Sequence, residues 1–517
     1  MRNKMNPSGV KSQKEVWTDS PSVTNEGSLA ERFLRDKRTF LLTAGWIYVL
    51  FLTTNLPWQL DDYDQAKPAF SSFEMVNEGH WLYQRMPLDL VAQKPPFFGW
   101  VSTVFYELTR SWDLAWRLPS LLSALAISIL LLRAASLAYG HTAGLISLGA
   151  FGFNLLSVRF ATLVTTDMLL ALSIFLAGLL IWQKIRSGNA WNSRDQWWFF
   201  GLLTISLFIK GPIVYAFLLL GIAAFAWGKR SDKVTSAWAG AWPWLGSLAV
   251  FLAWVTGGIL FKPGFYDQVV MREFLGRFSG TVHHPQPVYF YLPHILHKFL
   301  PWSALMILVA IVCRTRGRVR EALRSMPADI FWLICWSLGG LVVMSLVPSK
   351  RVDRIFPVVP PLCLLLGAQV SLGLTRQEIR GRVYQWSAAA LLFAFLFTTG
   401  YSLWKVVPGY RYQRDALVTF SRAVRQEAAR YHWRYEVVLS ENRTGTEGML
   451  LYLQKPHFFP LDKAVEKWNR GEIQALVIPE DQVSPAMAAL REANIAPLRT
   501  SKRKDFHAPS YILVTRA

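Results

Sequence analysis

The sequence predicts a polytopic α-helical membrane protein with about eleven transmembrane helices and a small C-terminal α/β domain. First, 52% of the 517 residues are hydrophobic and only 17% are charged, whereas a soluble domain carries about 25% charged residues. Second, apolar runs of spanning length recur from Thr39 onward. Third, much of the net charge of +21 lies in short loops between these runs, which is typical of membrane topology and argues against a nucleic-acid partner.

The predicted spans are the apolar runs that approach or reach the roughly 20 residues needed to cross a bilayer core of about 30 Å. The fifth and the sixth span are divided around Gly211–Pro212. We place the spans at residues 39–57, 113–132, 141–159, 166–183, 196–209, 212–228, 240–261, 293–313, 329–347, 355–374 and 384–404.

The loop charges predict the orientation of these spans. Residues 1–37 are polar, and a cleaved signal peptide would carry its apolar stretch much earlier, so we expect a cytoplasmic N-terminal tail. An odd number of spans then puts residues 405–517 on the outer side, as a soluble domain after a transmembrane domain at 38–404. Basic residues follow every even-numbered span, as the positive-inside rule requires: Arg133; Lys184, Arg186 and Arg194; Lys229, Arg230 and Lys233; Arg314, Arg316, Arg318, Arg320 and Arg324; and Arg376, Arg380 and Arg382.

The C-terminal segment has an ordinary soluble composition. Segments 435–440, 473–479 and 510–515 are rich in β-branched and aromatic residues and predict strands. Segments 416–430 and 485–493 have helical periodicity. We therefore expect a small α/β domain outside the membrane.

Charged residues gather at the predicted outer face, where basic side chains run against the topological bias. The spans themselves hold no buried acid or proton relay, which a transporter is expected to have. We therefore expect a site for an anion, such as the phosphate headgroup of a lipid. The charged residues lie in two long outer loops, 58–112 and 262–292, and in short turns: Asp61, Asp62, Asp64, Lys67, Lys94, Arg159, Asp167, Lys210, Arg272, Glu273, Arg277, His283, His284, Lys350, Arg351, Asp353 and Arg354.

The first outer loop carries a recognisable pattern. An acid, Asp64, opens a predicted amphipathic helix, and a Gly79–His80–Trp81 turn and Lys94–Pro95 follow it. Residues 58–100 thereby resemble the first outer loop of C-type glycosyltransferases that use polyprenyl-phosphate sugars. The relatives that show this pattern are the bacterial aminoarabinose transferases acting on lipid A and the protein O-mannosyltransferases.

Further motifs continue the resemblance in the same order along the chain, as far as about residue 375. They are Arg117–Leu118–Pro119, Thr166–Asp167, Lys210–Gly211, REFLGRF at 272–278, HHPQPVYFYLP at 283–293, Leu300–Pro301–Trp302 and PSKRVDRIFPVVPP at 348–361. The last is similar to a family turn in which a tyrosine stands where this chain has Ile355 or Phe356.

The resemblance implies the C-type glycosyltransferase fold and an integral-membrane glycosyltransferase in the bacterial inner membrane. Its donor would be a sugar on undecaprenyl phosphate, and its acceptor a lipid A, glycan or protein on the periplasmic face. No nucleotide would be needed. The alternative is a lipid-linked-sugar transporter without transferase activity.

The resemblance also implies roles for particular residues. Asp64 would orient the acceptor or act as its base, although an aspartate here also suits a helix N-cap. Lys94 and Arg277 would bind the donor phosphate, with a snorkelling lysine as the structural alternative for Lys94. Four more basic residues are either phosphate ligands or loop charges: Lys67, Lys210, Lys350 and Arg354. Two residues are acceptor contacts or structural groups: Asp167 and His284.

The sequence departs from the relatives at the positions that can hold a metal ion. The relatives that act on lipid A carry a glutamate immediately before the Lys-Pro and a histidine before the Arg-Phe. This chain has Gln93 and Phe274 at those places. We therefore expect no metal and no other cofactor.

Overall fold

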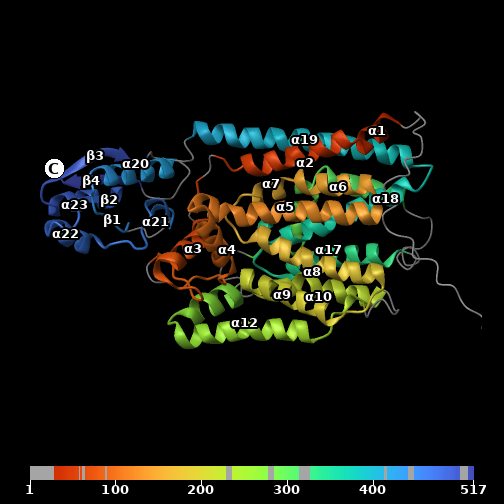
Figure 1. Cartoon of the computed structure of the whole chain (residues 1–517), viewed down its shortest axis with the longest axis horizontal. Coiled ribbons are helices and arrows are strands. Elements are labelled where there is room, and N and C mark those ends of the chain that lie inside the picture. Colours follow the sequence, from red (N-terminus) through yellow and green to blue (C-terminus); the bar gives the residue numbers. More distant parts are fainter. Residues whose placement is uncertain are drawn as a thin grey trace, which may run out of the picture.

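The computed structural model describes residues 28–56, 59–60, 65–87, 90–228, 236–276, 285–313, 326–412, 416–440, 447–500 and 510–516. Long helices run along the long axis of the molecule and form a bundle, and a small unit of strands and short helices lies at one end (Figure 1). Helices α3 and α4 lie between the bundle and this unit (Figure 1).

Six helices are long and apolar enough to cross a membrane, and a bent pair would make a seventh. The six are α5 (Trp112–Tyr139), α8 (Asp167–Ser187), α12 (Trp242–Phe261), α17 (Ala328–Leu346), the continuous stretch of η5 (Val352–Val358) with α18 (Val359–Leu374), and α19 (Arg380–Arg411). The chain is therefore a multi-pass membrane protein.

Helices also occupy the other predicted spans, but they are shorter. They are α2 (Lys37–Thr53), α6 (His141–Gly152) with α7 (Leu155–Phe160), α9 (Ser193–Lys210) and α10 (Ile213–Gly228). The count of eleven spans stays a prediction. Within the predicted N-terminal tail, α1 (Leu29–Arg35) packs on α19, and Arg380 lies 2.7 Å from Glu31.

The segment of the predicted span at 293–313 is broken into two helices. The chain forms η4 (Val288–Phe290) and α14 (Tyr291–Lys298), and then turns by 95° into α15 (Trp302–Val312). Pro301 stands in the break and has no backbone N–H, so it cannot continue the hydrogen-bond ladder of α14. Composition does not reveal the break, because the two arms together are apolar enough to span.

Glycines allow close approach at two places in the structure. Gly339 of α17 meets Gly221 of α10 so closely that a Cβ on Gly339 would lie 2.6 Å from the Gly221 nitrogen, a packing typical of membrane helices. Gly211 ends α9 with φ of 76°, and a Cβ there would lie 2.8 Å from a ring carbon of Phe274. Only glycine therefore fits, and Lys210 is held at the end of α9.

Two helices of the first outer loop, and one of the second, lie outside the long bundle. They are α3 (Ala66–Glu78), α4 (Phe97–Thr109) and the π-helix η3 (Tyr266–Leu275). Helix α3 ends at Gly79, which has φ of 77° and gives the chain a left-handed turn. The N-cap position of α3 is Gln65, whose side chain makes no capping hydrogen bond, and Asp64 lies outside the described residues.

The C-terminal unit contains a four-stranded sheet in the order β1-β2-β4-β3. Strands β1 and β2 are parallel, and β4 is antiparallel to β2 and to β3. Its elements are α20 (Ala416–Arg430), β1 (Tyr435–Val437), α21 (Glu447–Leu453), α22 (Leu461–Asn469), β2 (Ala475–Pro479), η6 (Glu480–Gln482), α23 (Val483–Ala489), β3 (Ala493–Arg499) and β4 (Tyr511–Arg516).

Strands are found at all three predicted places, but β3 is an additional strand. The predicted helix 485–493 instead ends at Ala489, and β3 begins at Ala493. This edge strand contains Pro497 and a register shift between Ile495 and Arg499. Proline and irregular pairing are tolerated at a sheet edge. With Pro497 in it, the segment lacks the alternation of apolar and polar residues that would have predicted a strand.

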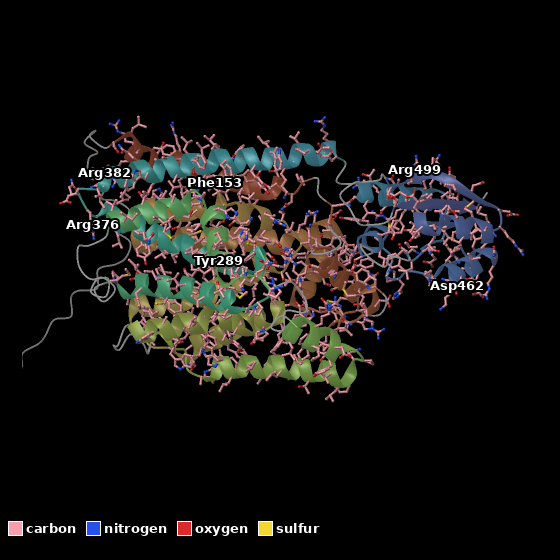
Figure 2. All side chains as sticks on the ribbon, turned by 180° about the vertical axis from the view of Figure 1, so that it is seen from behind. Phe153, Tyr289, Arg376, Arg382, Asp462 and Arg499 are labelled. Carbon is pink, nitrogen blue, oxygen red and sulfur yellow. The ribbon has the colours of Figure 1, made fainter. Side chains whose placement is uncertain are left out.

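The two ends of the bundle differ in their neighbours. Arg376 and Arg382, which we predict in a cytoplasmic loop, lie at one end of the molecule (Figure 2). The C-terminal unit, with Asp462 and Arg499, lies at the opposite end (Figure 2). The predicted outer loop helix α3 lies at the same end as that unit (Figure 1). This arrangement agrees with opposite sides of a membrane for the two ends.

Candidate active site

A cavity of about 620 Å³ lies where α3, the turn before α8, the end of α9, η3 and η5 converge. Charged side chains from the bundle, from both outer loops and from the C-terminal unit line it. The basic ones are Lys67, Lys94, Arg159, Lys210, Arg272, Lys350, Arg351 and Arg354, and the acidic ones are Asp167, Glu273, Asp353 and Glu447. Since the basic residues outnumber the acidic ones, the cavity favours an anion.

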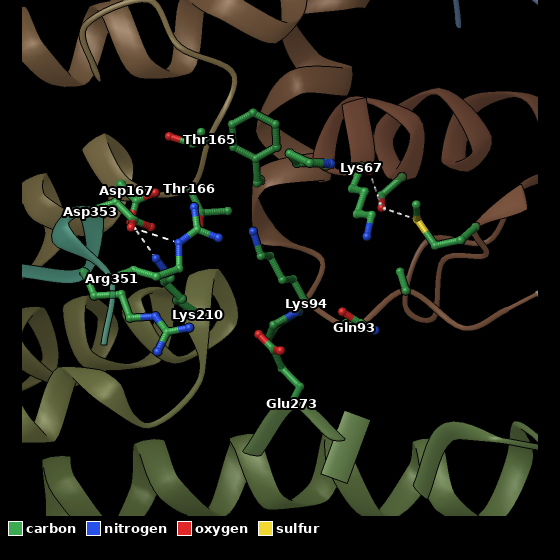
Figure 3. Close-up of a pocket in the computed structure, with 18 of the residues that line it drawn as sticks. Lys67, Gln93, Lys94, Thr165, Thr166, Asp167, Lys210, Glu273, Arg351 and Asp353 are labelled. Atoms are coloured by element: carbon green, nitrogen blue, oxygen red, sulfur yellow. Dashed lines mark hydrogen bonds and ion pairs between the residues drawn. The ribbon is translucent and has the colours of Figure 1, made fainter. Parts of the chain in front are cut away.

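Lys94 is held by a tight turn of the first outer loop. Arg85 and Val91 form an isolated antiparallel bridge, and the Ala92 N–H donates to the Gln84 carbonyl at 2.8 Å. Two prolines follow Lys94 and lead into α4. Figure 3 shows the Lys94 side chain extending into the cavity, with Lys67 of α3 on one side and Glu273 of η3 pointing toward it.

The second basic group is paired with an acid. Lys210 Nζ lies 2.5 Å from Asp167 Oδ1, and both side chains are buried, at 9% and 7% exposure. Asp167 begins α8 and Lys210 ends α9. Each charge therefore lies at the helix end whose dipole favours it, and the pair joins two helices at the floor of the cavity.

The turn before η5 and η5 itself supply three further basic residues. Lys350 Nζ donates to the Gln286 carbonyl at 2.8 Å, and Arg354 donates to the Ser349 carbonyl at 2.5 Å and to its hydroxyl at 3.1 Å. Burial lowers the pKa of the Lys350 ammonium. Arg351 lies 3.1 Å from Asp353 and keeps 31% of its side chain exposed, so it is the most accessible to a ligand among these three.

The structure brings many of the sequence-predicted residues together. Six of them line the cavity: Lys67, Lys94, Lys210, Lys350, Arg354 and Asp167. Asp64, Arg277 and His284 lie outside the described residues. Gln65, next to Asp64, is buried and accepts a hydrogen bond from the Val164 N–H at 3.1 Å. The start of α3 is thereby tied to the turn that leads to Asp167.

Sequence reasoning assigned no role to several residues that line the cavity. Arg159, Arg272 and Arg351 stood out only as charges at the outer face. Glu447 was missed altogether. It follows Asp167 by hundreds of positions and lies in a segment of soluble composition, where an acid is ordinary, so no local signal distinguishes it.

The positions that can hold a metal in the relatives offer poor ligands here. Gln93 lines the cavity, and Phe274 packs against Gly211 and lies 5.9 Å from the Phe251 ring. Among the described residues, no three His, Cys, Asp or Glu side chains lie close enough to hold an ion. An amide and a phenyl ring do not replace a carboxylate and an imidazole, so the described residues do not fit the metal.

Comparison with known proteins gives consistent results. Residues 93–258 match the family described as dolichyl-phosphate-mannose-protein mannosyltransferase. The undecaprenyl phosphate-alpha-4-amino-4-deoxy-L-arabinose arabinosyl transferase of Erwinia tasmaniensis is 25% identical over 345 residues, which cover 65% of this chain and 59% of the relative. A second such transferase, from Proteus mirabilis, is 24% identical over 63% of this chain and 57% of the relative. The chain thus spans less than two thirds of these relatives.

A solved structure extends the likeness to nearly the whole chain. The crystal structure of ArnT from Cupriavidus metallidurans bound to undecaprenyl phosphate superposes with a TM-score of 0.65 at 17% sequence identity. It covers 92% of this chain and 98% of that chain. This identity shows the fold alone, and the sequence matches add a likeness to the arabinosyl transferases over part of the chain. The resemblance drawn from the motifs is confirmed: the chain is similar in fold, and over part of its sequence, to the aminoarabinose transferases of the C-type glycosyltransferase superfamily.

Proposed function

We propose that this protein is a glycosyltransferase that moves a sugar from undecaprenyl phosphate to an acceptor outside the cytoplasm. The observation that carries the proposal is the cavity in which basic residues from distant parts of the chain converge. The relatives named as undecaprenyl phosphate-aminoarabinose transferases, and the neighbouring structure with bound undecaprenyl phosphate, support this donor. The acceptor is a lipid A, a glycan or a protein.

The mechanism follows from the charges. An acceptor oxygen attacks the anomeric carbon, and the bond from that carbon to the phosphate oxygen breaks. Undecaprenyl phosphate leaves with the bonding electrons, and Asp64 orients the acceptor or takes its proton as a general base. Lys94 and Arg277 stabilise the charge that develops on the phosphate, and Lys67, Lys210, Lys350 and Arg354 add to the positive field. Attack opposite the leaving group inverts the anomeric centre.

The location follows from the positive-inside rule. We infer a bacterial inner-membrane protein whose N-terminus is cytoplasmic and whose cavity and C-terminal unit face the periplasm. The separation of Arg376 and Arg382 from that unit supports this orientation (Figure 2). A reporter that is active only outside the cytoplasm should be active when fused after Ala517. Activity of a cytoplasmic reporter at the same place would contradict the orientation.

Transfer is tested with the purified full-length protein, undecaprenyl phosphate carrying radiolabelled 4-amino-4-deoxy-L-arabinose, and lipid A. Asp64→Asn removes the base and should lower the rate of transfer by about 10²–10⁴, while undecaprenyl phosphate binding stays intact. Asp61→Asn, in the same loop, is the matched control and should keep the normal rate.

The same assay separates the transferase from a transporter. Movement of the labelled lipid across a vesicle bilayer without any transfer to an acceptor would favour the transporter. A folded Asp64→Asn protein that transfers sugar at the normal rate would end the role proposed for Asp64.

A further inference from the structure

The C-terminal unit is docked on α3 through apolar side chains. Leu60, Phe70 and Phe73 of the first outer loop belong to one buried cluster with Met449 and Leu450 of α21. Removal of these side chains from water favours the contact. Helix α21 consequently has a defined place beside α3, although hundreds of residues separate the two in the sequence.

Polar contacts orient the same interface. The Leu60 N–H donates to the Tyr452 hydroxyl at 2.8 Å, and the Leu417 N–H donates to the Gln59 side-chain oxygen at 2.9 Å. His457 lies 3.4 Å from Glu78 at the last turn of α3. These contacts fix the C-terminal unit both before the start of α3 and at its last turn. Helix α21 therefore has a fixed orientation over the cavity.

Glu447 is the first residue of α21 and lines the cavity. Among the described residues of the C-terminal unit, it is the only one that does so. Its side chain is half-buried. The carboxylate makes no hydrogen bond or ion pair with any residue that the structure describes.

Among the described residues, other acids in the cavity are paired with basic residues, unlike the Glu447 carboxylate. Asp167 lies against Lys210, and Asp353 lies against Arg351. An acid that served to balance the excess of basic side chains would lie against one of them in the same way. The docked helix instead presents Glu447 to the cavity with its acceptor oxygens available to a ligand.

We propose that Glu447 accepts a hydrogen bond from a hydroxyl or a protonated amine of the substrates, on the transferred sugar or on the acceptor. This inference rests on the proposed function. A carboxylate repels a phosphate, so Glu447 does not bind the group that the basic residues hold. Hydrogen bonds from a hydroxyl or an ammonium to a carboxylate are charge-assisted and strong. The C-terminal unit is therefore a wall of the active site and takes part in substrate selection.

The experiment compares Glu447→Ala with Glu466→Ala in the full-length protein. Glu466 is an exposed acid on α22, outside the cavity, and is the matched control. Both variants should show the thermal unfolding of the wild type, because alanine is the best helix former. In Glu447→Ala, kcat/KM for sugar transfer to lipid A should fall by about ten- to a hundred-fold, whereas Glu466→Ala should transfer normally.

Binding measurements identify the group that Glu447 contacts. Undecaprenyl phosphate alone should bind Glu447→Ala as it binds the wild type. If the contact is to the sugar, undecaprenyl phosphate carrying 4-amino-4-deoxy-L-arabinose should bind more weakly. If the contact is to the acceptor, only the KM for lipid A should rise. Glu447→Gln separates an amine from a hydroxyl, because the neutral amide still accepts a hydrogen bond but loses the attraction of an ammonium.

Three outcomes would overturn the inference. Glu447→Ala that matches Glu466→Ala in every measurement would show that the carboxylate contacts no substrate. An equal loss of binding for undecaprenyl phosphate alone would show that Glu447 acts on the phosphate site. A wild-type protein that neither binds undecaprenyl phosphate nor transfers sugar would refute the proposed function first, and the inference with it.

Discussion

Lys210 and Asp167 join the end of α9 to the start of α8 through an ion pair of 2.5 Å at the cavity. A second pair, Lys184 with Asp195, joins the same two helices at their other ends. The two pairs hold α8 and α9 side by side, but only the first lies in the cavity. They therefore offer a way to separate helix stability from ligand binding.

Asp167→Asn should destabilise the protein and strengthen phosphate binding. Removing one partner of a buried ion pair costs about 3–5 kcal/mol, which thermal unfolding in detergent will measure. The released Lys210 ammonium should raise the affinity for undecaprenyl phosphate. Asp195→Asn should also lower stability, but leave this affinity unchanged. A folded Asp167→Asn protein with weaker phosphate binding would mean that Asp167 orients Lys210 toward the ligand.

Lys94→Ala should weaken the binding of undecaprenyl phosphate. A hydrogen bond to a charged group contributes about 1.5–3 kcal/mol, so the affinity should fall roughly 10- to 100-fold. Transfer should slow further if the contact tightens in the transition state. Lys463→Ala, on the exposed side of α22, removes the same charge far from the cavity and should bind normally. Equal affinities of the two variants would remove Lys94 from the phosphate site.

Phosphate binding should depend on pH through Lys350. Because burial lowers the pKa of its ammonium, Lys350 loses its proton at a lower pH than an exposed lysine does. Affinity for undecaprenyl phosphate should be full below this lowered pKa and fall as the pH rises through it. Lys350→Arg keeps its charge at alkaline pH and should move the fall to higher pH. Lys463→Arg is the control, and a profile that Lys350→Arg leaves unmoved would exclude Lys350 as the titrating group.

Sugar transfer should survive chelation. The described residues at the relatives' metal positions are Gln93 and Phe274, and neither replaces a carboxylate or an imidazole. Transfer rates measured with and without a chelator should therefore agree. A complete loss that added metal restores would show that other ligands are used, and His283→Ala and His284→Ala would then be the first variants to measure.

Much of the helical architecture was predictable because a bilayer imposes a length and a composition on each span. The apolar runs beginning near residues 113, 166, 240 and 329 are helices of the required length. The bend at Pro301 was not predictable from composition, since the two arms together are apolar enough to span. In the C-terminal unit, β1, β2 and β4 carry alternating or β-branched residues, whereas the edge strand β3 lacks this pattern.

The candidate site was predictable in part, for a similar reason. Lys94, Lys210 and Lys350 stand out because basic residues at the outer face oppose the topological bias. Their meeting in one cavity is consistent with that reading. Glu447 carries no such signal, because acids are common in soluble segments.

The sequence by itself determined that the chain crosses a membrane repeatedly, and which charges gather at one face. Hydrophobic length and loop charge are local properties, and a single segment displays each of them. Only the tertiary structure decided which charges neutralise one another, as Asp167 and Lys210 do, and which distant residues line the cavity, as Glu447 does. Ion pairing depends on distances of a few ångströms between segments far apart in the chain, and packing of helices and docking of the C-terminal unit set those distances.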